Sequence, residues 1–260
     1  MAKIEFRGVS KSYSSRNGNV LALSKLDLHV ADEELVTIVG ASGCGKSTLL
    51  SMLAGFDKPT TGQILVDDCE VREPGPDRGV IFQQTALFPW LSVEQNIKFG
   101  LRLRANASIS NADAVVQRLL QRTGLAAFRD RLPAELSGGM RQRAAIASVL
   151  AINPKVLLMD EPFGALDSLT RSVMQDFLLE LWDTDRKTVL LVTHDIDEAI
   201  YLADKTIVMS GHPGRVCEVI DVKLPRPRHF DIHSDSKFIE LRDRVRDVVR
   251  GEATATALTE

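Results

Sequence analysis

The sequence predicts an α/β fold in which two halves of a doubly wound core are separated by a helical insertion. Three observations support this fold class. A strand pattern at 34–40 leads through a glycine-rich loop into a helix pattern at 46–56. Two short apolar runs, 155–162 and 186–195, flank another helix pattern, and such runs suit strands that a parallel sheet buries on both faces. The region between the halves, 85–155, has mainly helical periodicity.

Residues 1–84 are expected to form the first half of the core. Alternating apolar and polar residues at 3–13 and 20–30 predict two strands, which we assign to an N-terminal antiparallel β-subdomain. The strand at 34–40 follows, and a further short strand is predicted at 79–83.

Residues 85–155 are expected to form an inserted helical subdomain, with helix patterns at 91–103 and 111–125. The second half of the core is expected at 156–225. A tail at 226–260 opens with prolines and ends in a charged amphipathic helix. The last ten residues of this tail are expected to be frayed.

The composition is ordinary for a soluble globular protein, with 44% hydrophobic and 26% charged residues. The net charge of −3 gives no general attraction to nucleic acid. Cys44, Cys69 and Cys217 form no closely spaced pair, which indicates a reducing compartment rather than a disulfide framework. The sequence begins without a signal-peptide pattern and contains no run of eighteen apolar residues, so we expect neither export nor a membrane span.

The pattern Gly-x-x-x-x-Gly-Lys-Ser at 40–47 predicts a phosphate-binding loop, because it lies between a predicted strand and a predicted helix. Backbone N–H groups of residues 42–45 are expected to surround a β-phosphate, assisted by the positive end of the helix. Lys46 is expected to reach the β- and γ-phosphates, and the Ser47 hydroxyl to bind Mg²⁺. These features predict a P-loop NTPase fold that binds a nucleotide. The predicted nucleotide-binding residues of the loop are Gly40, Ala41, Ser42, Gly43, Cys44, Gly45, Lys46, Ser47 and Thr48.

Two alternatives stay open at this loop. The pattern can arise by chance in an ordinary glycine turn. Cys44 either lies beside the phosphates, where alkylation would block nucleotide binding, or is a small side chain that fills space.

Acidic residues follow the apolar run of the second half. Asp160 is expected at the end of a buried strand, where it would bind a metal ion through water. Glu161 would point the other way in that strand and face the γ-phosphate as a general base. The alternative for this pair is capping of the next helix. His194 ends the next strand pattern and can hydrogen-bond the γ-phosphate, although a lone histidine at such a place often has no role.

A second anion site is predicted at the helix start "LSGGMRQR", residues 136–143. Ser137 can cap the helix, and in most proteins such a residue is only a cap. Gly138 and Gly139 directly after the cap are costly in a helix, because glycine loses more backbone entropy than alanine. They are explained if a large anion such as a triphosphate approaches the backbone closely.

Six motifs in fixed order resemble those of the ATP-binding subunits of ATP-binding cassette (ABC) transporters, over the region from Tyr13 to about residue 225. They are "GASGCGKST", Gln83, "LSGGMRQR", "VLLMDEP", "GALD" and His194. The resemblance implies a RecA-like core with an inserted α-helical signature subdomain. The stretches 79–101, 160–171 and 211–228 are similar to the nitrate/sulfonate/taurine importer branch.

The resemblance also implies roles for individual residues. Two copies would form a head-to-tail homodimer, with each ATP between the P-loop of one copy and Ser137, Gly138 and Gly139 of the other. Tyr13 would stack on adenine, and Asp167 would cross the dimer interface. The implied catalytic residues are Glu161, His194 and Gln83. The implied ligands of Mg²⁺ are Ser47, Gln83 and Asp160.

Two positions depart from the family pattern. Met140 stands where the family usually has Gln, and Gly164 stands where Ser often precedes the alanine of "GALD". Neither removes a group expected to contact phosphate, so full activity is expected.

The implied partners are two integral membrane permease subunits, which would dock near Leu87–Trp90, and a periplasmic or extracellular solute-binding protein acting through them. For Phe88 in that segment, packing inside the helical subdomain is the alternative. The implied place is the cytoplasmic face of the bacterial inner membrane. The implied activity is ATP hydrolysis that drives uptake of a small anion such as taurine, an alkanesulfonate or nitrate.

Two other functions are less well supported. An ABC-type ATPase acting on ribosomes or DNA would be expected to have a second cassette, long coiled-coil insertions or a basic excess, and none is found here. A P-loop kinase for a small molecule would leave "LSGGMRQR", Gln83 and His194 without a role.

Overall fold

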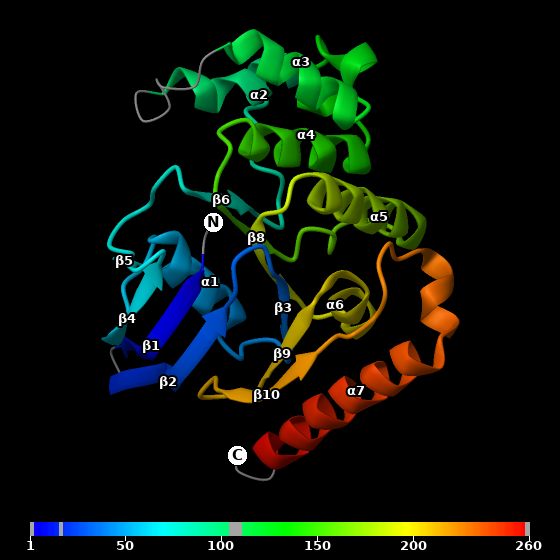
Figure 1. Cartoon of the computed structure of the whole chain (residues 1–260). Coiled ribbons are helices and arrows are strands. Elements are labelled where there is room, and N and C mark those ends of the chain that lie inside the picture. The colour runs from blue at the N-terminus through cyan, green and yellow to red at the C-terminus, as the bar shows by residue number, and fades with distance from the viewer. Residues whose placement is uncertain (1–2, 16–17, 104–110, 258–260) are drawn as a thin grey trace.

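The computed structural model describes residues 3–15, 18–103 and 111–257, which form two sheets and a separate helical layer (Figure 1). The larger sheet has the strand order β10-β9-β3-β8-β7-β6. Its neighbouring strands are parallel except β10, which runs antiparallel to β9. The strands are β3 (Leu35–Gly40), β6 (Arg78–Ile81), β7 (Val156–Asp160), β8 (Thr188–Thr193), β9 (Lys205–Met209) and β10 (Val216–Asp221).

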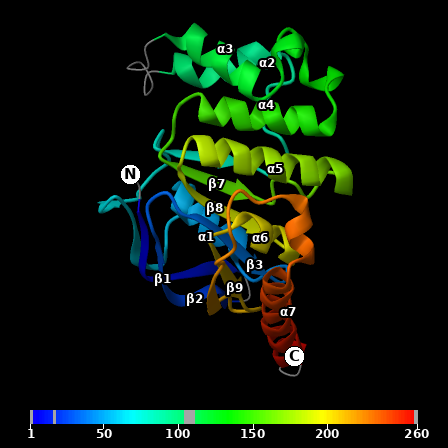
Figure 2. The same ribbon diagram turned by 45° about the vertical axis from the view of Figure 1, so that its right-hand side comes forward.

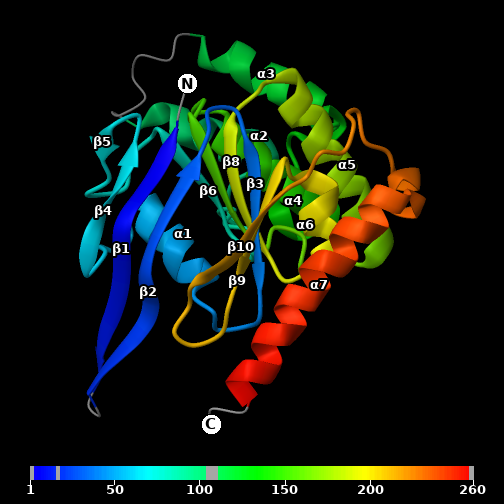
Figure 3. The same ribbon diagram turned by 60° about the horizontal axis from the view of Figure 1, so that its bottom comes forward.

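The smaller sheet is antiparallel, with the order β2-β1-β4-β5. Its strands are β1 (Ile4–Ser15), β2 (Gly18–Val30), β4 (Thr61–Val66) and β5 (Cys69–Glu70). Helix α1 (Lys46–Ala54) lies between this sheet and the larger one (Figure 3). Apolar side chains from both sheets and from α1 form one continuous core, which fixes the first turn of α1 against the end of β3.

The other face of the larger sheet is covered by α5 (Ser168–Thr184), α6 (Ile196–Leu202) and α7 (Ser236–Ala257), and Figure 2 shows these helices on one side. A 3₁₀ turn, Phe230–Ser234, precedes α7. Among the described residues, no helix is both long and apolar enough to cross a lipid bilayer.

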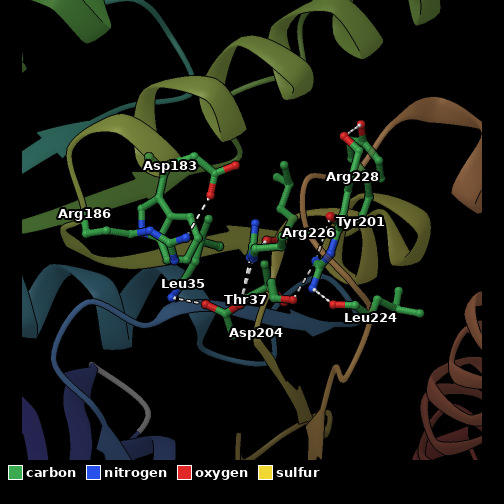
Figure 4. A network of polar contacts seen from close by, with 12 residues as sticks. Leu35, Thr37, Asp183, Arg186, Tyr201, Asp204, Leu224, Arg226 and Arg228 are labelled. Carbon is green, nitrogen blue, oxygen red and sulfur yellow. Dashed lines mark hydrogen bonds and ion pairs between the residues drawn. The ribbon is translucent and has the colours of Figure 1, made fainter.

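Two arginines anchor the start of the tail to the core (Figure 4). The Arg228 guanidinium donates hydrogen bonds to the carbonyl oxygens at the C-terminal end of α6, including that of Ala203 at 2.8 Å. Arg226 donates to Asp204 Oδ1 at 2.8 Å, and Asp204 Oδ2 accepts from the backbone N–H of Leu35 at 3.0 Å. The tail is therefore fastened to α6 and to the first residue of β3.

The helical layer stands beyond the end of the sheet that carries β6 (Figure 1). It has its own apolar core, and α4 packs against α5. Its elements are α2 (Val93–Phe99), α3 (Ala112–Arg122), α4 (Gly138–Leu150) and the 3₁₀ turns Gly100–Arg102, Ala126–Phe128 and Pro133–Glu135.

The predicted fold class is confirmed, with differences at several elements. The strand predicted at 79–83 ends at Ile81, and β8 ends at Thr193, so Gln83 and His194 lie in the loops after their strands. Helix α7 continues to Ala257, so most of the segment expected to be frayed is helical. Residues 258–260 of that segment lie outside the described part of the chain.

Candidate functional site

The glycine-rich loop joins β3 to α1, and its backbone needs glycine at several positions. Gly43 and Gly45 have φ values of +81° and +89°, a region that side chains disfavour. A Cβ at Gly40 would lie 2.5 Å from the carbonyl oxygen of Met209. The loop therefore curls tightly, and the Lys46 ammonium crosses it to donate to the carbonyl oxygens of Gly40 and Ala41 at 2.7 and 3.0 Å.

Cys44 lies inside this loop and has no exposed surface. Its Sγ is 3.7 Å from Lys46 Nζ, and burial raises the pKa of the thiol. Of the two interpretations, the structure supports the small side chain that fills space, because a reagent cannot reach this sulfur in the folded loop.

Ser47 and Asp160 come together from α1 and the end of β7. Ser47 Oγ donates a hydrogen bond to Asp160 Oδ1 at 3.1 Å. Burial raises the pKa of Asp160 above its usual value, and the neighbouring charge of Glu161 adds to this effect. A hydroxyl and a carboxylate are oxygen ligands that Mg²⁺ prefers, and a nearby cation would favour the charged carboxylate. Within the described ranges, no group of three or more His, Cys, Asp and Glu residues could hold a metal ion by itself.

Two side chains, from the loops after β6 and β8, converge on one carboxylate oxygen of Glu161 at the end of β7. Gln83 Nε2 donates to Glu161 Oε2 at 3.3 Å, and His194 Nδ1 lies 3.1 Å from the same oxygen. The structure therefore brings together all three residues that the sequence nominated as catalytic.

The direction of Glu161 has a different cause from the one expected. Strand alternation predicts that Glu161 points away from Asp160, but β7 ends at Asp160 and Glu161 has a φ of +45°. This left-handed conformation is costly for a side-chain-bearing residue. The Glu161 N–H donates to the carbonyl oxygen of Val192 at 2.9 Å, which holds the turn against β8. A residue whose backbone is held in such a costly conformation is typical of a functional site.

Tyr13 lies near the end of β1 with 42% of its surface exposed. Its hydroxyl donates to Asp57 Oδ2 at 2.9 Å, and Lys11 Nζ is 4.8 Å from the ring centroid. Lys11 also donates to Asp57 Oδ1 at 2.5 Å. Burial opposes ionisation of Asp57, but the hydrogen bonds from Lys11 and Tyr13 outweigh it and lower the pKa of this carboxyl. The ring is thus held by two residues that the sequence analysis missed, although Lys11 precedes Tyr13 by two positions and shares its strand face.

The second predicted anion site is the start of α4. Ser137 caps the helix, and its Oγ accepts from the N–H of Met140 at 3.3 Å. A Cβ at Gly139 would lie 2.8 Å from Thr170 Cγ2, and one at Gly138 would lie 3.3 Å from Leu166 Cδ2. Packing against α5 and the loop before it is therefore a second reason for the two glycines. Among the described residues, no hydrogen bond or ion pair joins 137–139 to the loop 40–48.

The loop before α5 ends at Asp167, which caps that helix. Asp167 Oδ1 accepts from the N–H of Thr170 at 3.0 Å, and this hydrogen bond lowers the pKa of the carboxyl. A cleft of about 510 Å³ separates the segment after β6 from α4 and the loop before Asp167. Its lining includes Gln83, Gly138, Arg141 and Leu166.

The segment 87–90, which follows the cleft-lining residues 83–85 in the chain, contains one exposed aromatic side chain. Trp90 is 70% exposed, whereas Phe88 is half-buried. The Phe88 ring centroid lies 4.5 Å from that of Phe99 and 5.6 Å from that of Trp90. Packing against Phe99 in the helical layer thus explains the position of Phe88. It does not explain why most of the Trp90 side chain is exposed.

Comparison with known proteins gives consistent results. A family model described as ABC transporter matches residues 23–164. An ATP-binding protein of Brucella abortus is 51% identical over 94% of this chain and 92% of its own length. The nitrate import ATP-binding protein NrtD of Synechocystis is 41% identical over 96% of each chain. The dimeric ATP-binding cassette MJ0796, solved in a post-hydrolysis state with ADP and Pi, has a TM-score of 0.73 and 32% identity, and the match covers 85% of this chain and 100% of that one.

Proposed function

Because the chain belongs to the ABC transporter family of ATP-binding proteins, we propose that it is the ATPase subunit of an importer for a small anion. The observation that carries the ATPase part of this proposal is the convergence of Gln83 and His194 on Glu161 Oε2, next to Asp160, which accepts a hydrogen bond from Ser47 of the phosphate-binding loop. The similarity to nitrate import proteins of Synechocystis and Synechococcus elongatus, and to a nitrate transport protein of Klebsiella oxytoca, favours nitrate among the solutes considered.

Hydrolysis needs a base beside the γ-phosphate, and we assign this role to Glu161. Its Oε2 would accept the proton of the attacking water, while His194 and Gln83 fix the direction of the carboxylate. Lys46, which crosses the loop here, would turn its ammonium to the β- and γ-phosphates. The Ser47–Asp160 pair fits Mg²⁺ and, with Gln83, would hold it. Bound there, Mg²⁺ would neutralise charge on the phosphate oxygens.

We propose that two copies are needed for activity. Ser137, Gly138 and Gly139 have no hydrogen bond to the P-loop of their own chain among the described residues. The similar cassette MJ0796 is a dimer. A head-to-tail homodimer would place this helix start on ATP held by the other copy, with Asp167 at the interface. The N-terminal end of α4 offers the positive dipole that such contact requires.

The membrane partners are proposed from the exposed surface near Leu87–Trp90. Two permease subunits would cover the Trp90 side chain there, which is 70% exposed, since tryptophan is enriched among the residues that anchor protein interfaces. A solute-binding protein outside the membrane would deliver the anion to these permeases, and this subunit would act from the cytoplasmic face. No observation favours ribosome or DNA binding, given the net charge of −3.

Phosphate release and dimer formation test the ATPase. Glu161→Gln should abolish release of phosphate from Mg-ATP and should give an ATP-dependent dimer in size-exclusion chromatography. Glu180→Gln makes the same chemical change on an exposed residue of α5 and should keep wild-type activity. A Glu161→Gln protein that hydrolyses ATP at the wild-type rate would disprove the role of this carboxylate.

A further inference from the structure

An arginine on α5 joins the loop before Asp167 to the loop that carries His194. Arg171 Nη2 donates to the carbonyl oxygen of Leu166 at 3.1 Å. Arg171 Nη1 lies 3.4 Å from Asp195 Oδ2. Asp195 directly follows His194 in the chain. One guanidinium therefore bridges two loops that come from different strands of the sheet.

Both chain neighbours of His194 belong to one hydrogen-bonded turn. Thr193 Oγ1 accepts from the N–H of Asp195 at 3.0 Å and donates to Glu198 Oε2 at 2.5 Å. Asp195 Oδ1 accepts from the N–H of Glu198 at 3.1 Å and so caps α6. Because Thr193 and Asp195 are fixed on either side, the backbone of His194 can shift only together with this turn.

Two buried polar atoms of this network have no hydrogen-bond partner among the described residues. They are Arg171 Nε and Glu198 Oε1. Burying an unpaired donor or acceptor costs stability, and a group of this kind in a native structure calls for an explanation. A network with a spare donor and a spare acceptor can change its pairing when one of its loops moves.

We propose that Arg171 is a positioning residue. Through Arg171, the position of the loop 164–167 determines how His194 is aligned with Glu161. This rests on the proposed ATPase function. In that function the loop faces the second copy, whereas His194 contacts the carboxylate that acts on water. Arg171 would make the alignment of His194 depend on how that loop is seated. A guanidinium suits this task because its rigid fork can bond a carbonyl oxygen and a carboxylate at once.

The test compares Arg171→Ala and Arg171→Lys with Arg118→Ala. Arg118 is an exposed arginine of α3 whose side chain makes no hydrogen bond or ion pair within the described chain. We expect kcat for ATP hydrolysis to fall roughly 10- to 100-fold in Arg171→Ala, the cost of misplacing a catalytic group. KM for ATP and the midpoint of thermal unfolding should change little. Arg171→Lys should recover only part of kcat, because an ammonium cannot replace the fork. Arg118→Ala should match the wild type.

Asp195→Asn provides an independent variant if removal of the arginine disturbs folding. The asparagine keeps an oxygen that can cap α6 but loses the charge that faces Arg171. In a double-mutant cycle, Arg171→Ala and Asp195→Asn should lower kcat by less than the product of their separate effects, because both break the same link.

The outcomes separate the two claims. A wild-type kcat in Arg171→Ala, or a fall that only follows lost thermal stability, overturns the positioning role and leaves the ATPase standing. A wild-type protein that releases no phosphate from ATP, alone and with its permease, would overturn the proposed function and this inference with it.

Discussion

His194 Nδ1 and Glu161 Oε2 lie 3.1 Å apart, although the two residues follow different strands and are separated by a complete helix. The contact exists because β7 and β8 are parallel neighbours whose carboxyl ends meet at one edge of the sheet. We propose that this pair aligns the carboxylate for ATP hydrolysis, and replacement of the histidine gives the first prediction.

His194→Ala should lower kcat for ATP hydrolysis by about 10²-fold or more, because Glu161 loses the group that orients it. ATP affinity should fall by much less than kcat, since the phosphate loop at 40–48 is expected to make most of the contacts with the phosphates. Steady-state phosphate release and equilibrium binding of a fluorescent ATP analogue measure the two quantities. Loss of both in parallel would show that the histidine supports binding rather than chemistry.

Removal of the Tyr13 ring should weaken nucleotide binding with little effect on kcat. Stacking of a base on an aromatic ring is worth about 1–3 kcal/mol, so Tyr13→Ala should raise Kd for ATP by at least about fivefold. Asp57→Asn should give a smaller increase, because it weakens the hydrogen bonds from Tyr13 and Lys11 that hold the ring. Equal Kd values for wild type and Tyr13→Ala would rule out the stacking role.

The stability of the fold should depend on pH through Glu198. This side chain is 5% exposed, and burial raises its pKa from 4.5 to about 7. The folded state therefore holds the proton more tightly than the unfolded state. The stabilisation is complete below about pH 4.5 and is lost as pH rises through about 7, with a total on the order of 3 kcal/mol.

Glu198→Gln checks this pH dependence, because glutamine cannot ionise. The free energy of unfolding, measured by urea denaturation between pH 4.5 and 8, should decline less with rising pH in the variant than in the wild type. Parallel curves for the two proteins would contradict a raised pKa at Glu198.

The cysteines should differ in reactivity. Cys69 is exposed, whereas Cys44 is fully buried and burial raises the pKa of its thiol. Because the thiolate is the reactive form, iodoacetamide should label Cys69 quickly and Cys44 only after unfolding. Peptide mass spectrometry of native and urea-treated samples distinguishes the sites. Rapid labelling of Cys44 in the native protein would show that the phosphate loop opens.

Local patterns in the sequence were sufficient to predict the elements that carry the site. The P-loop has glycines at positions with positive φ, and α5 matches its predicted range at Ser168–Thr184. Helix α6 and strands β9 and β10 were not among the predicted elements. They are short, and tertiary contacts rather than their own periodicity stabilise them.

The same limit applies to the site. The sequence nominates Glu161, His194 and Gln83 as catalytic because each lies at the end of a recognisable strand pattern and matches a family motif. The left-handed turn at Glu161 was not found, because a hydrogen bond to Val192 in another strand imposes it. Asp57 was missed for a similar reason, since it lies 44 positions from Tyr13 and only the fold brings them together.

Uptake of nitrate by a reconstituted system tests the central claim most directly. Proteoliposomes would contain this subunit with the permease and solute-binding protein of its own host, and accumulation of ¹⁵N-nitrate would be measured with Mg-ATP on the side of this subunit. The account predicts ATP-dependent accumulation with the wild type and none with Glu161→Gln. ATP hydrolysis without accumulation of nitrate, taurine or an alkanesulfonate would contradict the assignment as an importer of small anions.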